Sequence, residues 1–254
     1  MNFCLRSIGL AAFAFSALFL HSAAFAADIT VLSSNAMTET MKELVPQFEK
    51  LTGHKILGVY EPTNLIVERL KKGEAADVVI LIKPSLTALF KSKEAREGTA
   101  VDLAKTALNL AVKSGGAKPD ISTKEGFRKA MLDSKSIAIS KAGASGIQFK
   151  RALESEGMLT QLQPRLQEID GAESVGAFAR DGRAQYAVQM KSELLPVSGI
   201  EIIGPLPGTL NFEIVLSAAV AASAKEEKPA EELIKFLSAP AAASSYKKTG
   251  MEPL

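Results

Sequence analysis

The chain contains little of the side-chain chemistry on which most enzymes depend. Its 254 residues include one cysteine, Cys4, two histidines and no tryptophan. Because no cysteine follows the N-terminal segment, an internal disulfide, a thiolate nucleophile and a cysteine-ligated metal site are excluded from the body of the chain. His54 stands beside Gly53, and we expect it to be solvent-exposed in a turn. A zinc site needs several histidine or cysteine ligands, and this part of the chain offers one. The sequence therefore predicts no metal site.

Signatures of nucleotide binding and of hydrolysis are also missing. No Walker A sequence and no G-x-G-x-x-G stretch occurs, so no cofactor is predicted. Ser145 lies in Gly-Ala-Ser-Gly, which departs from the G-x-S-x-G nucleophile elbow, and no histidine follows it in the chain. We therefore expect a protein that is not an enzyme. The enzymatic alternative is a hydrolase or lyase that uses carboxylates, and it predicts a carboxylate of raised pKa in a cleft.

The charge balance is close to neutral and aromatic residues are few. The formal net charge is +2, and aromatic residues make up 6% of the chain. This balance argues against nucleic acid or an anionic membrane as the main partner. The low aromatic content also disfavours a cleft that stacks sugars on aromatic rings.

The N-terminal residues have the pattern of a secretory signal peptide. Arg6 supplies the positive charge, an apolar run extends from Ile8 to Leu20, and Ala24-Phe25-Ala26 is a small-x-small cleavage site. About thirteen apolar residues suit a signal peptide, whereas a membrane span needs roughly twenty. We expect residues 1–26 to be removed and the mature chain to be periplasmic, with no membrane insertion.

Beyond residue 26, short β-branched runs alternate with longer amphipathic segments. Strands are predicted at Asp28–Ser33, Lys55–Tyr60, Val78–Ile82, Leu108–Lys113, Ser136–Ser140, Ala184–Met190 and Phe212–Ala221. Helices are predicted at Thr38–Thr52, Asn64–Lys72, Pro84–Lys91, Thr123–Leu132, Ser145–Ser155 and Glu173–Arg180. Successive strand–helix units of this kind predict an α/β fold with mostly parallel sheets flanked by helices.

Two breaks rich in glycine and proline divide this pattern. They lie near residues 114–119 and 204–208, and the section between them has strands and helices of its own. We predict one lobe from residues 27–106 plus 212–254 and a second lobe from residues 107–211. Ligands of open α/β sheets bind beyond the carboxyl ends of the strands, so the cleft between the lobes is the predicted site.

Three junctions between a predicted strand and a predicted helix carry small polar residues or glycine. These junctions contain Ser33, Ser34, Asn35, Thr63, Asn64, Ser145 and Gly146. The first N–H groups of a helix have no internal partner and lie at the positive end of its dipole, so they attract anions. Three such helix starts at one cleft predict a site for a small anion. The alternative is that these side chains only cap their helices.

Four stretches resemble the molybdate-binding proteins of ABC transporters. They are Ile29–Met37, Leu70–Ile80 with its Gly-x-x-Ala-Asp-Val pattern, Ser145-Gly146, and Phe236–Ala242 followed by Gly250–Pro253. Their shared order covers essentially the whole mature chain. The resemblance implies a two-lobed type II periplasmic-binding fold and delivery of a small anion to an ABC transporter permease of the inner membrane. A sensor in place of the permease is the alternative, and we expect a monomer.

The resemblance also implies which residues hold the ligand. It places a hydroxyl donor at Thr63 and backbone donors at Ser145 and Val175. Two positions depart from the family pattern, because Ala36 stands where a serine is usual and Gln189 where a tyrosine is usual. Gln189 still offers an amide donor. A molybdate- or tungstate-like oxyanion is thus one expected ligand.

Another oxyanion or a small organic acid is the second expected class of ligand. Asn35, Asn64 and Gln189 are suitable donors for such a ligand. Glu61 lies near an expected anion-binding junction, where a carboxylate that faced inward would repel the ligand.

Overall fold

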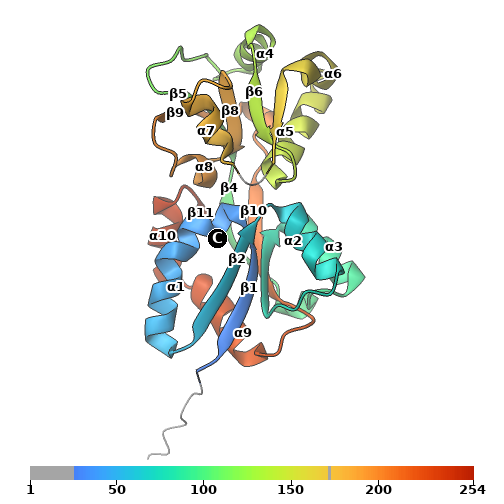
Figure 1. Cartoon of the computed structure of the whole chain (residues 1–254), viewed down its shortest axis with the longest axis vertical. Coiled ribbons are helices and arrows are strands. Elements are labelled where there is room, and N and C mark those ends of the chain that lie inside the picture. Colours follow the sequence, from blue (N-terminus) through green and yellow to red (C-terminus); the bar gives the residue numbers. More distant parts are fainter. Residues whose placement is uncertain (1–25, 171–172) are drawn as a thin grey trace, which may run out of the picture.

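The computed structural model describes residues 26–170 and 173–254, and these residues form two lobes joined by extended segments (Figure 1). The predicted signal peptide falls almost entirely on residues 1–25, which lie outside the described part. Within the described ranges, no helix has both the length and the apolar character needed to cross a membrane.

The lower lobe in Figure 1, lobe one, is built on a six-stranded sheet of order β11-β4-β10-β3-β1-β2. Its strands are β1 (Asp28–Ser34), β2 (Lys55–Glu61), β3 (Val78–Ile82), β4 (Val101–Thr106), β10 (Ile214–Val220) and β11 (Glu252–Pro253). Its helices are α1 (Thr38–Thr52), α2 (Thr63–Lys71), α3 (Lys83–Ser92), α9 (Glu227–Leu237) and α10 (Ala243–Lys248), with short 3₁₀ turns η1 (Asn35–Met37), η2 (Glu97–Thr99) and η5 (Pro240–Ala242).

The upper lobe, lobe two, contains a five-stranded sheet of order β7-β6-β8-β5-β9. Its strands are β5 (Leu108–Lys113), β6 (Ile137–Ser140), β7 (Leu166–Ile169), β8 (Tyr186–Met190) and β9 (Ile200–Pro205). Its helices are α4 (Lys124–Asp133), α5 (Ala144–Ser155), α6 (Leu159–Leu162), α7 (Val175–Arg180) and α8 (Lys191–Leu194), with 3₁₀ turns η3 (Gln163–Arg165) and η4 (Gly208–Leu210).

The two-lobed α/β architecture is confirmed, but the sheets are mixed and not mostly parallel. Strand β1 pairs in parallel with β2 and β3, and β6 pairs in parallel with β7 and β8. Strand β10 is antiparallel to β3 and β4, and β5 is antiparallel to β8 and β9. The antiparallel strands adjoin the connections between lobes, because a chain that crosses to the other lobe and returns enters each sheet in the opposite direction.

The chain crosses between the lobes at two places. It leaves lobe one between Thr106, the last residue of β4, and Leu108, the first residue of β5. It returns between Pro205 and Ile214, which end β9 and begin β10. The lobe boundaries predicted after residues 106 and 211 lie within these two connections.

Helix α1 shows how the sequence pattern produces the core. Met41, Leu44 and Phe48 recur at helical spacing and are buried. Each fully buried side chain of this size contributes about 1.5–3 kcal/mol. The helix ends at Gly53, whose φ of 80° is the left-handed conformation that glycine adopts without steric cost.

The expectation that His54 is exposed is wrong. Its side chain is buried and stacks against Phe48, with ring centroids 6.0 Å apart. Its Nδ1 accepts a hydrogen bond from the Ala27 amide, and its Nε2 lies 3.4 Å from Glu232 Oε2. Its position beside the start of β1 and the middle of α9, away from the cleft, gives it a structural role.

Candidate functional site

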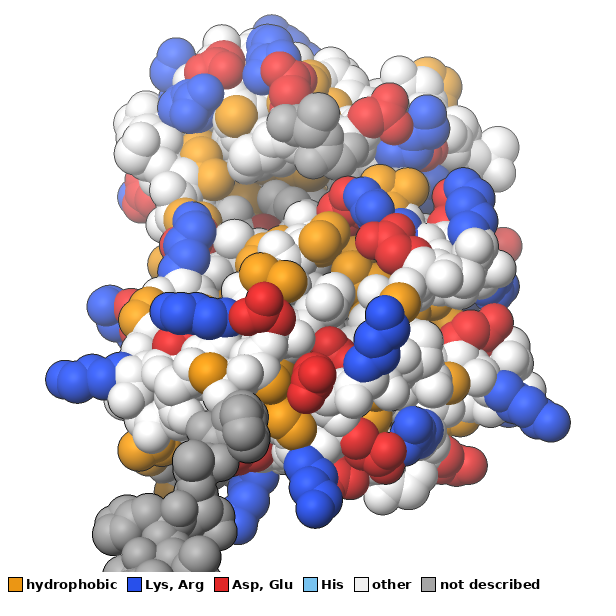
Figure 2. All heavy atoms as spheres, turned by 60° about the horizontal axis from the view of Figure 1, so that its bottom comes forward, with side chains coloured by type: hydrophobic (Ala, Val, Ile, Leu, Met, Phe, Trp, Pro, Cys, Tyr) orange, Lys and Arg blue, Asp and Glu red, His pale blue; other side chains and the backbone are white. Residues whose placement is uncertain are grey.

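Two hollows lie where the lobes meet, and the short helix α8 contributes side chains to both. One, the hinge hollow, has a volume of about 400 Å³. The other, the cleft hollow, has a volume of about 290 Å³. Figure 2 shows the recess between the lobes, while Lys, Arg, Asp and Glu side chains are scattered over the surfaces of both.

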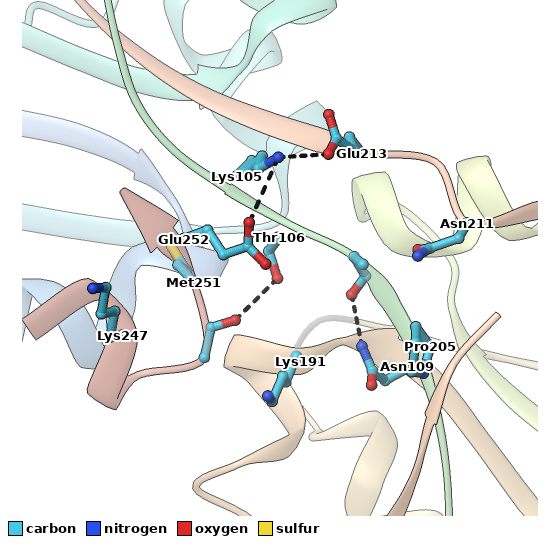
Figure 3. A pocket seen from close by; sticks show the side chains of 12 residues that line it. Lys105, Thr106, Asn109, Lys191, Pro205, Asn211, Glu213, Lys247, Met251 and Glu252 are labelled. Atoms are coloured by element: carbon cyan, nitrogen blue, oxygen red, sulfur yellow. Dashed lines mark hydrogen bonds and ion pairs between the residues drawn. The ribbon is translucent and has the colours of Figure 1, made fainter. Parts of the chain in front are cut away.

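Some polar groups that line the hinge hollow bind one another or nearby carbonyls, whereas Lys191, Lys247 and Asn211 make no such contact among the residues drawn (Figure 3). Lys105 Nζ lies 2.6 Å from Glu213 Oε1 and 3.5 Å from Glu252 Oε2. Asn109 Nδ2 donates to the Ala107 carbonyl at 3.1 Å. These contacts hold together β4, the chain returning to β10 and the C-terminal segment. We therefore assign the hinge hollow to the support of the connection between the lobes.

The cleft hollow has walls from both lobes. Lobe one contributes Asn35, Thr38, Glu39 and Pro62. Lobe two contributes Ser140, Ile169, Glu173, Ser174, Val175, Gln189, Ser192, Glu193, Pro196 and Val197. Most of these residues follow the carboxyl ends of strands, which is where ligands of α/β sheets bind. The cleft hollow is therefore the candidate functional site.

The lobe-one wall is fixed by hydroxyl groups at the ends of β1 and β2. Thr63 Oγ1 lies 3.4 Å from Ser34 Oγ, and Ser34 Oγ also accepts from the Ala36 amide at 3.4 Å. Ser33 Oγ donates to the Ser34 carbonyl. Ser34 thus caps η1, as the capping alternative expected. The hydroxyls of this junction position Asn35, whose side chain lines the hollow.

The start of α5 packs closely on the end of β6. Ser140 Oγ accepts a 2.9 Å hydrogen bond from the Gly143 amide. A Cβ atom on Gly146 would lie 1.7 Å from the Ser140 carbonyl oxygen, so only glycine fits there. Ser145 is buried beside it. This contact holds the first turn of α5 against the strand and places Ser140 on the hollow.

A glutamine and a glutamate form the most unusual part of the lobe-two wall. Gln189 Nε2 donates a 2.9 Å hydrogen bond to Glu193 Oε1. Burial raises the pKa of Glu193 to about 7, although hydrogen bonds from Gln189 and the Met190 backbone favour the ionised form. Gln189 Oε1 and Ser192 Oγ are buried and have no hydrogen-bond partner among the described residues. A ligand that hydrogen-bonds to such atoms gains more binding free energy than at exposed atoms, because the buried atoms are already desolvated.

The other carboxylates near the hollow have cationic partners. Glu39 lies 2.7 Å from Lys42, and Glu173 lies 3.1 Å from Arg183. The described residues that line the cleft hollow include no lysine or arginine. Glu193 is thus the carboxyl group of the lining whose charge is set by pH and not by an ion pair.

Glu61 does not repel a ligand in the cleft. Both of its carboxylate oxygens are bound by Arg69, with Oε2 at 2.7 Å from Nε. The Arg69 guanidinium lowers the pKa of Glu61, so this carboxylate is neutralised by an ion pair. Glu61 does not line the cleft hollow.

The predicted site residues fall into three groups. Asn35, Val175 and Gln189 line the cleft hollow. Ser33, Ser34, Thr63, Ser145 and Gly146 are buried at the strand–helix junctions that shape it and are not part of its lining. Asn64 is exposed and lines a separate hollow between α2 and α3. Sequence reasoning missed Ser192 and Glu193, although they follow the carboxyl end of β8 like the other candidates.

Comparison with known proteins decides the family. Residues 29–252 match the family model described as bacterial extracellular solute-binding protein. The chain belongs to this family. It is 32% identical over 231 residues to a protein of Pseudomonas sp. named aconitate isomerase, and the aligned region covers 89% of this chain and 88% of that protein. It is 25% identical over 239 residues to the molybdate-binding protein ModA of Azotobacter vinelandii, with 91% and 92% covered.

The fold comparison agrees with the family. The solved Azotobacter vinelandii periplasmic molybdate-binding protein superposes with a TM-score of 0.73 at 21% identity, over 88% of this chain and 98% of that chain. The resemblance to the molybdate-binding proteins and the two-lobed type II fold are thereby confirmed. The ligand of this solute-binding protein is a separate question, because its relatives carry different names.

Proposed function

We propose that this solute-binding protein captures a small organic polycarboxylate in the cleft between its lobes. The observation that carries the proposal is the mixed lining of the cleft hollow, where the amides of Asn35 and Gln189 adjoin the Ser192 hydroxyl and the Glu193 carboxyl. Molybdate and tungstate are compact tetrahedral anions. A polycarboxylate carries several carboxylate groups on a carbon frame, so it can reach the amide and hydroxyl donors of both lobes at once and suits this lining better.

Two further observations support an organic acid over a metal oxyanion. Ala36 and Gln189 replace the serine and tyrosine usual in molybdate-binding proteins, and Ala36 brings no hydroxyl to η1. The relative named aconitate isomerase points to the same class, because aconitate is a small unsaturated tricarboxylate. A molybdate- or tungstate-like oxyanion is the alternative ligand, supported by the relative named ModA.

Binding would use neutral groups from both lobes. Asn35 supplies an amide from lobe one, while Gln189, Ser192 and the amides near Val175 act from lobe two. Closing of the lobes removes water and strengthens each hydrogen bond. Groups placed for one ligand are left unpaired by a wrong one, and this penalty provides selectivity.

We propose that the capture takes place in the periplasm, after residues 1–26 have been removed. The mature chain would act as a monomer. The captured ligand would pass to an ABC transporter permease, and a sensor is the alternative partner. Co-purification of the mature chain with an ABC transporter permease from its own cell membranes, in the presence of ligand only, is the measurement that separates the two partners.

A thermal-shift screen tests the ligand class. The mature chain would be heated with trans-aconitate, cis-aconitate, citrate, tricarballylate, molybdate, tungstate, sulfate and phosphate. A ligand at a thousand times its Kd stabilises by about 4 kcal/mol. At roughly 2–4 °C per kcal/mol for a chain of this size, the shift is readily measured. A shift with the tricarboxylates supports the proposal, and a shift with molybdate and tungstate alone contradicts it.

Isomerisation of the bound polycarboxylate is a second candidate function. Glu193 favours it, because a carboxyl of pKa about 7 beside a ligand both accepts and returns a proton near neutral pH. The Glu193 carboxylate would take a proton from a methylene carbon next to a ligand carboxyl. The C–H electron pair would form a new C=C bond between the former methylene carbon and its neighbour. The electrons of the original double bond would move to the carbon at its other end, and that carbon would receive the proton from Glu193. The prediction that the chain is not an enzyme stays a prediction.

Proton NMR of trans-aconitate incubated with the mature chain tests this second function. Catalytic appearance of the cis isomer, lost in Glu193→Gln, is the result expected of an isomerase. A ligand that binds tightly and is recovered unchanged leaves capture as the function.

A further inference from the structure

The cleft hollow presents a difficulty for any anion, because its described lining includes carboxyl groups and no basic side chain. Glu193 lines it, and neither a lysine nor an arginine is found in its described lining. At an effective dielectric of about 20, two like charges some 5 Å apart repel strongly. An ionised Glu193 would therefore oppose the binding of a tricarboxylate or of molybdate alike.

The charged groups around Glu193 do not remove this repulsion. Helix α8 packs against η1, β5, β8 and α7. The titratable residues on these elements, on α8 itself and on the hollow are Lys113, Arg180, Tyr186, Lys191, Glu39 and Glu173. Arg180 is bound to Asp181 at 2.7 Å, and no lysine or arginine of the described residues forms an ion pair with Glu193. With the described groups, this carboxyl group is neutralised by a proton.

We propose that the anion enters the cleft together with one proton, which Glu193 takes up, and that the Gln189 amide then turns its NH₂ group toward the anion. Glu193 and Gln189 thus act as one ligand-binding unit. The proposal rests on the proposed function in one respect, which is that an anion binds in the cleft. It applies to the capture of an organic acid or of an oxyanion, with Glu193 protonated in the complex, and not to the isomerisation, which needs the ionised carboxylate.

The hydrogen bonds of Gln189 explain why the amide turns. With Glu193 ionised, Gln189 Nε2 donates to Glu193 Oε1, and Gln189 Oε1 is left buried without a described partner. That arrangement offers an anion an acceptor where it needs a donor. With Glu193 protonated, its hydroxyl donates to Gln189 Oε1, so the amide nitrogen is released for the anion. The neighbouring Ser192 hydroxyl, also without a described partner, is a second donor.

The pH dependence of affinity follows from linkage. Glu193 of the free protein changes charge near pH 7, so the binding-competent protonated form is abundant below that pH and scarce above it. Affinity should be constant below about pH 6 and should fall by up to tenfold per pH unit above about pH 8. The probes trans-aconitate and molybdate keep a constant charge in the upper part of this range.

Isothermal titration calorimetry of the mature chain between pH 6 and pH 9 tests the proposal. The probe is trans-aconitate or molybdate, whichever stabilises the chain more in the thermal screen. In two buffers of different ionisation enthalpy at pH 8, we expect uptake of close to one proton per anion. Glu193→Gln mimics the protonated carboxyl, so it should bind with no pH dependence and roughly ten- to a hundredfold more tightly than wild type at pH 9.

Glu39→Gln is the matched control, because it removes a carboxylate of the same hollow that is already paired with Lys42. This variant should keep the pH slope of wild type. A flat pH profile in wild type, or an unchanged slope in a folded Glu193→Gln variant, would overturn the proposal while leaving anion capture intact. If no anion binds at any pH, the proposed function is wrong and the proposal falls with it.

Discussion

Gln189 donates through Nε2 to Oε1 of Glu193 at 2.9 Å, across the junction where β8 ends and α8 begins. Two opposing effects act on the carboxyl group. Burial favours its protonated form, whereas this hydrogen bond and one from the Met190 backbone favour its ionised form. Burial is the larger effect and raises the pKa to about 7. The pair thus changes its charge near pH 7.

Replacing Gln189 by methionine should raise the pKa of Glu193 further. The hydrogen bond to the carboxylate is lost, and bonds to charged groups contribute about 1.5–3 kcal/mol. One pKa unit corresponds to about 1.4 kcal/mol, so we expect a rise of about one unit. NMR titration of the Glu193 side-chain carbon measures it. Gln47→Met is the control, because the Gln47 amide donates to the Glu43 carbonyl within α1, and it should leave the titration unchanged.

The same carboxyl group predicts how stability depends on pH. The pKa of Glu193 is higher in the folded chain, about 7, than its ordinary value of 4.5. Folding therefore favours the protonated form, so this contribution is present below about pH 4.5 and is lost as pH rises through 7. The contribution is at most about 3 kcal/mol, and solvent screening of the partly exposed side chain reduces it.

Thermal unfolding of wild type and Glu193→Gln at pH 4 and pH 8.5 measures this contribution. The side chain introduced by Glu193→Gln does not titrate. The free energy of unfolding of this variant, relative to that of wild type, should therefore be about 1–3 kcal/mol higher at pH 8.5 than at pH 4. Glu201→Gln, which removes a half-buried carboxylate of β9 that is paired with Lys118, provides the comparison. An equal response of both variants would contradict the assignment of the raised pKa to Glu193.

Local sequence signals were sufficient to predict the helices and strands with the clearest apolar patterns. Helix α1 occupies the predicted range Thr38–Thr52, because its apolar spacing is regular and Gly53 ends it. Strand β3 is buried throughout, as its unbroken apolar run indicated. By contrast, β4 was missed, since Val101–Thr106 mixes polar and apolar residues and is stabilised mainly by pairing with β10.

The strand–helix junctions pointed to an edge of both sheets where a hollow lies, and Asn35, Val175 and Gln189 line that hollow. That these residues bind a ligand stays a prediction. Glu193 could not be singled out, because its altered pKa arises from burial against parts of the fold distant in sequence. Its position four residues after Gln189, just beyond a buried strand, was the available signal.

Gly146 is expected to be essential for the shape of the cleft. In Gly146→Ala, the added Cβ would lie 1.7 Å from the Ser140 carbonyl oxygen, so the first turn of α5 must move away from β6. We expect a loss of stability of about 2 kcal/mol or more and weaker ligand binding. Gly98→Ala is the control, because a Cβ there meets no atom within 4 Å. Equal unfolding midpoints for the two variants would contradict this close packing.

The combined variant Thr63→Ala and Ser145→Pro tests whether the helix starts also bind the anion. Thr63 Oγ1 contacts Ser34 Oγ, and Ser145 lies in the first turn of α5, where proline removes an N–H without breaking the helix. If these groups donate to the ligand, each loss should cost about 1.5–3 kcal/mol, so calorimetry should show affinity reduced by at least a hundredfold. The unfolding transition should stay cooperative. Since both residues lie beneath the lining and not in it, unchanged affinity would mean that Asn35, Gln189 and Ser192 form the binding surface and that the junction residues only position it.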